Sequence, residues 1–198
     1  MANEVCYFPG CMQNASVRTY PVWKRRVVNE AMYCEEHAQV FLANYCNQQL
    51  SGEGPPQSWG DAVGFDIELL LCDDRPDKPC WFSLREVGGS RRLDCQTGIF
   101  EAAALQRELE RLSAPRPLTH RAMASVITAL GGRLECVVID KFFPTQEVAY
   151  EAKLHIQQKD TTILVDVRPS DAVVLAVTCD VPIAVSNSVL ARLAESQR

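Results

Sequence analysis

The sequence contains no apolar run of the roughly 18 residues that a membrane-spanning helix needs. Its first residues also lack the basic and apolar regions of a secretory signal peptide. We therefore expect a cytoplasmic protein without a membrane partner. An excess of basic residues is missing too, because 20 lysines and arginines stand against 25 acidic residues, for a net charge of −5. Nucleic-acid binding draws mainly on phosphate neutralisation by basic side chains, so the overall charge counts against that class of partner.

Low-complexity tracts and long internal repeats are absent from the 198 residues, and 47% of the residues are hydrophobic, which is enough for a packed core. This length predicts one domain with an appendage, or two small domains. Nine cysteines are present. In a cytoplasmic protein they argue against a disulfide framework and for metal binding or buried thiols.

Three cysteines and a histidine near the start of the chain have the spacing of a zinc site. Cys6 and Cys11 flank a tight turn that can direct two thiolates to one point. Cys34 and His37 follow as a second close pair. The pattern C-x4-C … C-x2-H is typical of Cys3His sites, and bound zinc supplies folding free energy to a unit with little core of its own. We predict a structural Zn2+ here, with Cys46 as the reserve ligand; the alternative is four unligated side chains.

Composition divides the chain into a zinc-binding unit over residues 1–50, a linker over 51–61 and a larger domain over 62–198. The linker is rich in glycine and proline and has no hydrophobic periodicity. In the first unit, the run Lys24-Arg25-Arg26 offers a basic edge for phosphate contact. Three nearby glutamates nearly cancel its charge, so we interpret the run as solvated surface.

The larger domain alternates strand-type and helical hydrophobic patterns in an order that predicts an α+β fold with a mixed or antiparallel sheet. Its first three strands are joined by short connections and fit an antiparallel meander. The predicted strands span 62–71, 80–86, 91–97, 134–141, 148–157, 161–167 and 183–185. The predicted helices span 37–49, 99–112, 118–130, 172–178 and 189–195, the first of them in the zinc-binding unit.

Residues 161–186 form the stretch around which the predicted domain is organised. A β-branched, apolar run opens it and predicts a buried central strand. Arg168-Pro169 ends this strand, because proline has no N–H for a ladder, and opens a helix, since proline is favoured at the first helical position. Ser170 and Asp171 suit the first turn of that helix, where free N–H groups and the helix dipole favour oxygen atoms.

Three sequence blocks resemble the bifunctional nuclease domain family. The strongest is Arg-Pro-Ser-Asp-Ala at 168–172, followed by an apolar helix and a Pro-Ile-Ala-Val-Ser strand; the others are Arg-Pro-Leu-Thr-His at 116–120 and Gly-Ile-Phe-Glu-Ala at 98–102. The resemblance covers residues 65–194. It implies nuclease activity on DNA and RNA. Together with the many apolar strands of a single domain, it also leads us to expect a homo-oligomer, a dimer or larger.

The two Arg-Pro blocks predict a shared anion pocket, because each block opens a helix and helix N-termini bind anions through free N–H groups. Arg116 and Arg168 are expected to clamp a phosphate with bidentate hydrogen bonds. Thr119 and Ser170 are expected to lie beside that phosphate, in the first turns of the two helices.

Three further residues are candidates for catalysis. Asp171, with Glu101, is expected to hold a divalent cation or to activate water. His120 is the histidine nearest these blocks and is expected to act as general acid or base. Each candidate also has a structural interpretation: Asp171 caps its helix, Arg168 pairs with Asp166 or Asp171, and His120 lies on an exposed first turn.

Two functions besides nuclease activity therefore stay open. The larger domain can be a non-catalytic module that binds an anionic ligand or a protein partner, which suits the acidic charge. Alternatively, the zinc-binding unit contacts nucleic acid and the larger domain oligomerises. The dense set of carboxylates that a metal-dependent nuclease normally carries is missing from the sequence.

Overall fold

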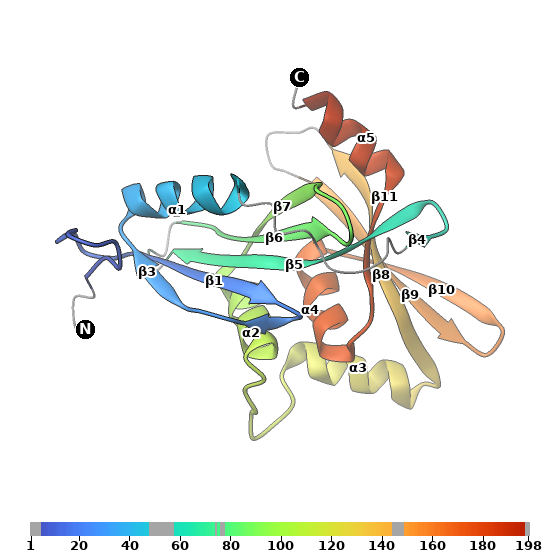
Figure 1. Cartoon of the computed structure of the whole chain (residues 1–198). Coiled ribbons are helices and arrows are strands. Elements are labelled where there is room, and N and C mark those ends of the chain that lie inside the picture. Colours follow the sequence, from blue (N-terminus) through green and yellow to red (C-terminus); the bar gives the residue numbers. More distant parts are fainter. Residues whose placement is uncertain (1–4, 48–57, 74, 76–77, 144–148, 197–198) are drawn as a thin grey trace.

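The computed structural model of the chain describes residues 5–47, 58–73, 75, 78–143 and 149–196. It has the predicted α+β fold, in which helices pack on a mixed sheet (Figure 1). The helices are α1 (Glu35–Asn47), α2 (Ile99–Leu109), α3 (Thr119–Ala129), α4 (Pro169–Cys179) and α5 (Asn187–Ser196). The strands are β1 (Val17–Trp23), β2 (Arg26–Val27), β3 (Ala31–Tyr33), β4 (Ser58–Trp59), β5 (Ala62–Asp73), β6 (Cys80–Glu86), β7 (Arg92–Thr97), β8 (Gly132–Phe143), β9 (Ala149–Gln158), β10 (Thr161–Val167) and β11 (Ile183–Ser186).

The main path of the sheet runs β10-β9-β8-β11-β5-β1-β2. The pair β8–β11 is parallel, and the other strand pairs are antiparallel. Strands β5, β6 and β7 form the predicted antiparallel meander. Figure 1 shows α1 above the sheet and α2 and α3 below it. The helices in the described part of the chain are too short or too polar to cross a membrane.

The N-terminal strands belong to the same sheet as the larger domain. Strand β1 pairs with β5 from Val17, opposite Asp73, to Pro21, opposite Leu69. Residues 51–57 of the predicted linker lie outside the described residues, and the next two residues form β4, which pairs with β5. The division of the chain at 51–61 therefore stays a prediction, while the sheet itself is continuous across it.

Helix α4 occupies the centre of the core. It is apolar along nearly its whole length, its residues 172–176 are buried, and it packs against α2, α3, β8 and β9. Pro169 lies in its first turn, as the sequence predicts. The helix ends at Asp180, which adopts the left-handed conformation with φ 53° and hydrogen-bonds back to the last turn.

Arg25 fastens the β1–β2 hairpin to this helix end. Its guanidinium donates hydrogen bonds to the carbonyl oxygens of Ala176, at 3.1 Å, and Val181, at 2.8 Å. A third hydrogen bond, at 3.0 Å, reaches the carboxylate of Asp66. A cation suits the C-terminus of a helix, where unpaired carbonyl groups gather. The interpretation of residues 24–26 as solvated surface is thus wrong for Arg25, whose side chain is only 17% exposed.

Strand β10 corrects a second expectation. It forms where the sequence predicts, but it lies at the end of the sheet, and its residues are exposed from Thr161 to Asp166. The chain leaves β10 through α4, which returns across β8 and β9 and so covers those strands instead. The central, buried position in this half of the sheet belongs to β8, where Val137 and Ile139 are fully buried.

Candidate functional site

The first turns of three helices meet at one place and carry three of the predicted site residues, with a fourth just before one of the helices. Glu101 lies in the first turn of α2, His120 in that of α3 and Asp171 in that of α4. Arg168 is the residue immediately before α4. We call these four residues the Arg168 cluster. Helix N-termini carry positive potential, so their convergence favours carboxylates or a bound anion at this point.

Asp171 is the centre of the Arg168 cluster. Its Oδ2 accepts a hydrogen bond from Nε of Arg168 at 2.8 Å, and its Oδ1 lies 3.1 Å from Nε2 of His120. Arg168 also donates from Nη2 to Oε1 of Glu101 at 2.6 Å. The structure therefore brings the three predicted catalytic residues together: Arg168 links Glu101 to Asp171, and Asp171 contacts His120.

Exposure differs sharply within the Arg168 cluster. The side chain of Arg168 is 66% exposed, whereas those of Asp171 and Glu101 are 20% and 17% exposed. The carboxylates thus lie inside and the guanidinium covers them from outside. Burial alone would raise the pKa of Asp171, but the hydrogen bonds from Arg168 and His120 outweigh it and lower that pKa. The hydrogen bonds to Asp171 and Glu101 raise the pKa of Arg168.

Gly98 makes room for one of the carboxylates. It precedes α2, and a Cβ at this position would lie 2.5 Å from Oε2 of Glu101. The backbone of Gly98 has φ −75°, which any residue can adopt, so the requirement is one of space and not of conformation. A glycine here lets the Glu101 side chain fold back over the start of its own helix, within reach of Arg168.

The structure gives less support to the other three residues predicted for the anion pocket. Arg116 and Thr119 are exposed, and neither makes a hydrogen bond or ion pair with the Arg168 cluster within the described part of the chain. Ser170 is buried in the first turn of α4. The two Arg-Pro blocks do open neighbouring helices, as their contact through His120 and Asp171 shows. The catalytic and anion-binding roles of all seven residues stay predictions.

The Arg168 cluster does not fit a divalent cation as it stands. Arg168 donates to both carboxylates, so a cation bound between them would have to displace the guanidinium. Among the residues that the structure describes, the group of three or more ligands that could hold a metal ion lies elsewhere, near the N-terminus.

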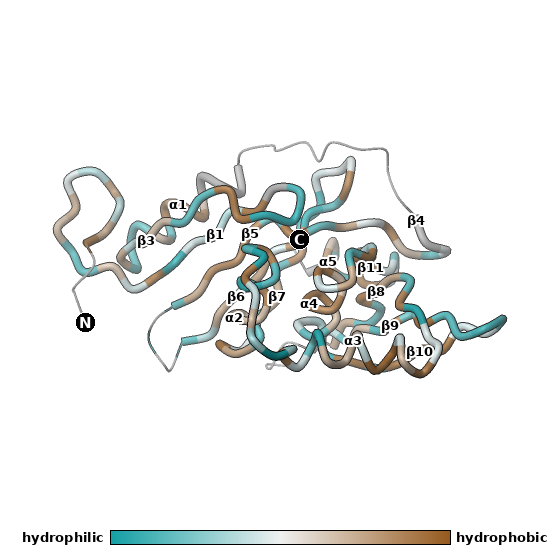
Figure 2. The backbone as a smooth tube through the Cα atoms, turned by 90° about the horizontal axis from the view of Figure 1, so that it is seen from below, coloured by the Kyte–Doolittle hydropathy of each residue, from teal (hydrophilic) through white to brown (hydrophobic). Residues whose placement is uncertain are grey.

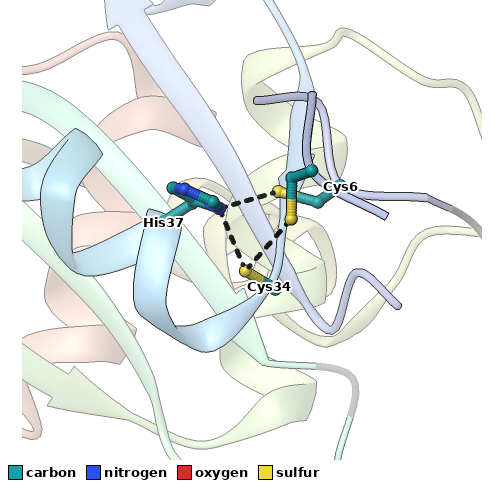
Figure 3. A group of neighbouring side chains, drawn as sticks. Cys6, Cys34 and His37 are labelled. Atoms are coloured by element: carbon teal, nitrogen blue, oxygen red, sulfur yellow. Dashed lines mark hydrogen bonds between the residues drawn. The ribbon is translucent and has the colours of Figure 1, made fainter. Parts of the chain in front are cut away.

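That group consists of Cys6, Cys11, Cys34 and His37, the four predicted zinc ligands. Their ligand atoms lie within 4.8 Å of one another. Figure 3 shows Cys6, Cys34 and His37 pointing toward a common centre. Nδ1 of His37 lies 3.6 Å from Sγ of Cys6 and 3.3 Å from Sγ of Cys34. The side chain of Cys46, the predicted reserve ligand, lies outside the described residues.

These distances fit a tetrahedral metal site. Zn–S and Zn–N bond lengths place sulfur and nitrogen ligands about 3.5 Å apart and two sulfurs about 3.8 Å apart. Sγ of Cys11 and Sγ of Cys34 are 4.0 Å apart. The ring of Phe8 stacks on that of His37 with 4.0 Å between the ring centroids, which fixes the orientation of the imidazole. The residues can therefore hold a metal ion with little rearrangement.

The surroundings of Cys6 favour its thiolate form. Burial acts to raise its pKa, but backbone hydrogen bonds from Cys34 and Phe8, with side-chain contacts to Cys34 and His37, bring the pKa down to about 7. Thiolates are the form in which cysteines bind metals. Three of the remaining described cysteines fit the other sequence interpretation, because Cys80, Cys95 and Cys136 are buried free thiols, whereas Cys72 and Cys179 are half-buried.

Sequence reasoning missed a polar network on the strands of the meander. Arg85 is hydrogen-bonded to the buried carboxylate of Glu68, and Arg92 donates to Ser83 at 2.8 Å and to Asp94 at 2.8 Å. These residues lie on neighbouring strands, and the spacing within one strand gave no signal for their pairing. The network borders a cavity of about 350 Å3 between α1 and strands β5–β7.

Comparison with known proteins agrees with the resemblance carried by the three sequence blocks. Residues 83–197, more than half of the chain, match the bifunctional nuclease domain, so the chain belongs to the bifunctional nuclease domain family. It is 38% identical over 119 residues to an uncharacterized protein of Mycobacterium tuberculosis strain CDC 1551 / Oshkosh, covering 60% of this chain and 69% of that protein. An uncharacterized protein of Mycobacterium tuberculosis strain ATCC 25618 / H37Rv matches with the same identity and coverage.

Proposed function

We propose that this chain is a nuclease that hydrolyses phosphodiester bonds in DNA, RNA or both. The observation that carries the proposal is the hydrogen-bonded set of His120, Asp171 and Arg168 at converging helix N-termini. It combines a potential general base, a carboxylate that orients this base and an exposed cation for phosphate. Membership of the bifunctional nuclease domain family supports the same class of reaction.

His120 is the proposed general base. The carboxylate of Asp171 accepts a hydrogen bond from Nε2–H of a neutral imidazole, which leaves Nδ1 free to accept a proton. In the proposed step, Nδ1 takes a proton from a water molecule whose oxygen attacks phosphorus. The bond from phosphorus to the leaving oxygen breaks, and that oxygen takes a proton from solvent. Asp171 then stabilises the imidazolium that has formed.

Arg168 is the proposed phosphate ligand. Its side chain is 66% exposed, and its guanidinium can exchange one carboxylate partner for a phosphate, with which arginine forms bidentate hydrogen bonds. The free N–H groups at the starts of α3 and α4 would add to the binding of the same phosphate, and Arg116, Thr119 and Ser170 are its proposed supporting ligands. The predicted catalytic cation is given no step, because Arg168 stands between its candidate ligands.

The Cys6, Cys11, Cys34 and His37 group is the proposed site of a structural zinc ion. Small buried clusters of this kind contribute little hydrophobic free energy. The core around the ligands holds few residues, among them Val17, and a bound metal supplies the missing stabilisation.

Cleavage of labelled oligonucleotides tests the proposed activity. The full chain is incubated with single- and double-stranded DNA and RNA, with Mg2+, with Mn2+ and with EDTA. His120→Asn is expected to slow cleavage at least about 100-fold, the lower limit for loss of a general base. His155→Asn on β9, away from the Arg168 cluster, is the matched control and should cleave normally. Absence of cleavage on every substrate, or full activity of His120→Asn, contradicts the proposal.

One observation favours the alternative of a non-catalytic binding module. Two carboxylates already neutralise Arg168, and the chain is acidic overall, as suits a binder of a protein or small anion. This alternative predicts that the chain does not cleave nucleic acid and is not retained on heparin. It also predicts that the Arg168→Ala variant is less stable than the wild type. A nuclease instead requires that Arg168→Ala weakens oligonucleotide binding while its melting temperature stays nearly unchanged.

A further inference from the structure

Strand β10 presents an edge that proteins normally protect. It pairs with β9 along its whole length, from Thr161 opposite Gln158 to Val167 opposite Ala152, with no register shift. On its other side no strand pairs with it within the described part of the chain. Proteins protect such edges with prolines, lysines or bulges, because unpaired N–H and C=O groups recruit further strands. Strand β10 has none of these devices.

The exposed edge is apolar on both faces of the sheet. Leu164 is 53% exposed, and its neighbours Ile163 and Val165 are 40% and 38% exposed on the opposite face. Ile163 and Val165 pair with Ile156 and Leu154 of β9, both of which belong to the main core. The core therefore continues to the edge of the sheet and stops there without a cover.

Helix α3 adds a second apolar strip on the face of the sheet that carries Ile163 and Val165. None of its residues is buried, and Met123, Val126 and Leu130 follow one another at helical spacing along an exposed side. The helix lies over this face because Ile127 and Ile156 both adjoin Gly132, and Ile156 pairs with Ile163. In Figure 2, α3 and β10 lie at the same border of the molecule and carry hydrophobic segments.

We propose that two copies of this chain associate through β10, paired antiparallel about a two-fold axis at Leu164, with their α3 strips flanking the joint. In this register Leu164 faces the partner subunit's Leu164, and Ile163 faces the partner subunit's Val165. All seven residues of β10 then pair, and the sheet continues from one copy into the other. The proposal is independent of the proposed nuclease activity.

The charges of the strand favour a second copy as the occupant. Asp166 is the charged residue of β10, and the register centred on Leu164 places it opposite the partner subunit's Thr162. A register centred one residue earlier, on Ile163, would place Asp166 opposite the partner subunit's Asp160, and directly opposed like charges destabilise a sheet. In the register centred on Leu164, apolar residues therefore meet apolar residues, and the acidic residue meets a neutral one.

The size of a stable interface explains the part played by α3. Stable interfaces bury about 800 Å2 on each partner, more than the pairing of one short strand provides. The α3 strip extends the apolar surface beyond the strand on the core side of the sheet. An exposed apolar area spread over two adjacent elements is typical of an interaction surface.

Sedimentation and light scattering of the full chain at micromolar concentration test the proposal. The expected mass is twice the 22.1 kDa of one chain. Leu164→Lys on the strand and Val126→Glu on the helix should each shift the protein to the monomer mass with unchanged circular dichroism. Val28→Lys, which replaces an exposed apolar residue elsewhere, is the matched control and should stay dimeric. A wild-type monomer overturns the proposal, as does a dimer that survives both variants.

Crosslinking tests the register without destabilising the strand. Opposed residues in an antiparallel pair have Cα atoms about 4.5–5.5 Å apart, within the range of a disulfide. With diamide as the oxidant that accepts two electrons and two protons from the two thiols, Leu164→Cys should give a covalent dimer above the wild-type background. Thr161→Cys, about 20 Å from its own copy at the rise of a strand, should not. Equal crosslinking of the two variants would overturn the register.

Discussion

Replacing Arg25 tests whether one side chain ties the N-terminal hairpin to the central helix. Its guanidinium bonds to the carbonyl oxygens of Ala176 and Val181 and to the carboxylate of Asp66. Arg25→Ala removes all three hydrogen bonds and leaves the end of α4 without its cation. The backbone at residue 25 has φ 55°, a strained conformation for arginine and alanine alike, so the substitution changes the contacts and not the strain.

The expected loss of stability follows from the two carbonyl bonds. Hydrogen bonds with a charged donor contribute about 1.5–3 kcal/mol each, and we take the lower value because water can reach part of the site. The Asp66 side chain is 38% exposed, so its ion pair adds little. The sum is about 3 kcal/mol. In a domain of this size, about 2–4 °C of melting temperature correspond to each kcal/mol, so we expect a decrease of about 6–12 °C.

Thermal unfolding followed by circular dichroism gives the measurement. Arg26→Ala is the matched control, because the neighbouring arginine is exposed and should change the free energy of unfolding by less than about 0.5 kcal/mol. Arg25→Lys keeps the charge but loses the planar donor set, so it should recover only part of the stability. Equal melting temperatures for Arg25→Ala and Arg26→Ala would refute the reasoning.

Four further predictions follow from the two clusters. Metal analysis should find about one zinc per chain, and Cys34→Ser should lower this content and speed proteolysis of the N-terminal region; a metal-free wild type of equal protease resistance would contradict it. Gly98→Ala should displace the Glu101 carboxylate from Arg168 and cost less than about 1 kcal/mol of stability in urea titrations, and its affinity for inorganic phosphate should approach that of Glu101→Gln. Glu101→Gln should raise the affinity for inorganic phosphate in calorimetry, because it removes a competitor for Arg168; unchanged affinity would count against Arg168 as a phosphate ligand. The pKa of Asp171 is lowered in the folded state, so its contribution to stability is complete above the pKa of an unfolded aspartate, about 3.9, and is lost as the pH falls through the lower folded value; Asp171→Asn should flatten the acid limb of the urea midpoint plotted against pH.

In the larger domain the sequence predicted the helices and strands well because local signals mark them, whereas it missed strands β1, β2, β3 and β4. Pro169 fixes the start of α4, and the alternation in residues 62–71 and 80–86 marks the paired strands β5 and β6. The sequence did not reveal where each strand lies in the sheet. An apolar run such as residues 161–167 is equally compatible with a buried strand and with an edge that a second molecule covers. Only the path of α4 across β8 and β9 distinguishes the two in this fold.

The candidate sites show the same difference between local contacts, which the sequence predicts, and long-range contacts, which it does not. The Cys6–Cys11 and Cys34–His37 pairs are close in sequence, so spacing alone was enough to predict their meeting. The contact of Arg168 with Asp171 is similarly local, three residues apart. Its second contact, with Glu101, joins residues 67 positions apart and depends on the packing of α2 against α4. Arg25 was misjudged because its partners are backbone carbonyls up to 156 positions away, which no pattern of side chains can reveal.

The two interpretations of the Arg168 cluster differ in the freedom of one side chain. With His120 neutral, the four residues carry two negative charges and one positive charge, so an approaching phosphate meets a net negative site. An anion can bind if Arg168 turns from a carboxylate toward the ligand. This change is accessible because Arg168 is mostly exposed while Glu101 and Asp171 stay enclosed by the helix starts. After Arg168 turns, Glu101 and Asp171 still lie in the first turns of α2 and α4, where the helix dipole stabilises a carboxylate, and Asp171 still orients His120. The same contacts that make a structural ion pair at rest can therefore serve a nuclease, provided that Arg168 exchanges partners.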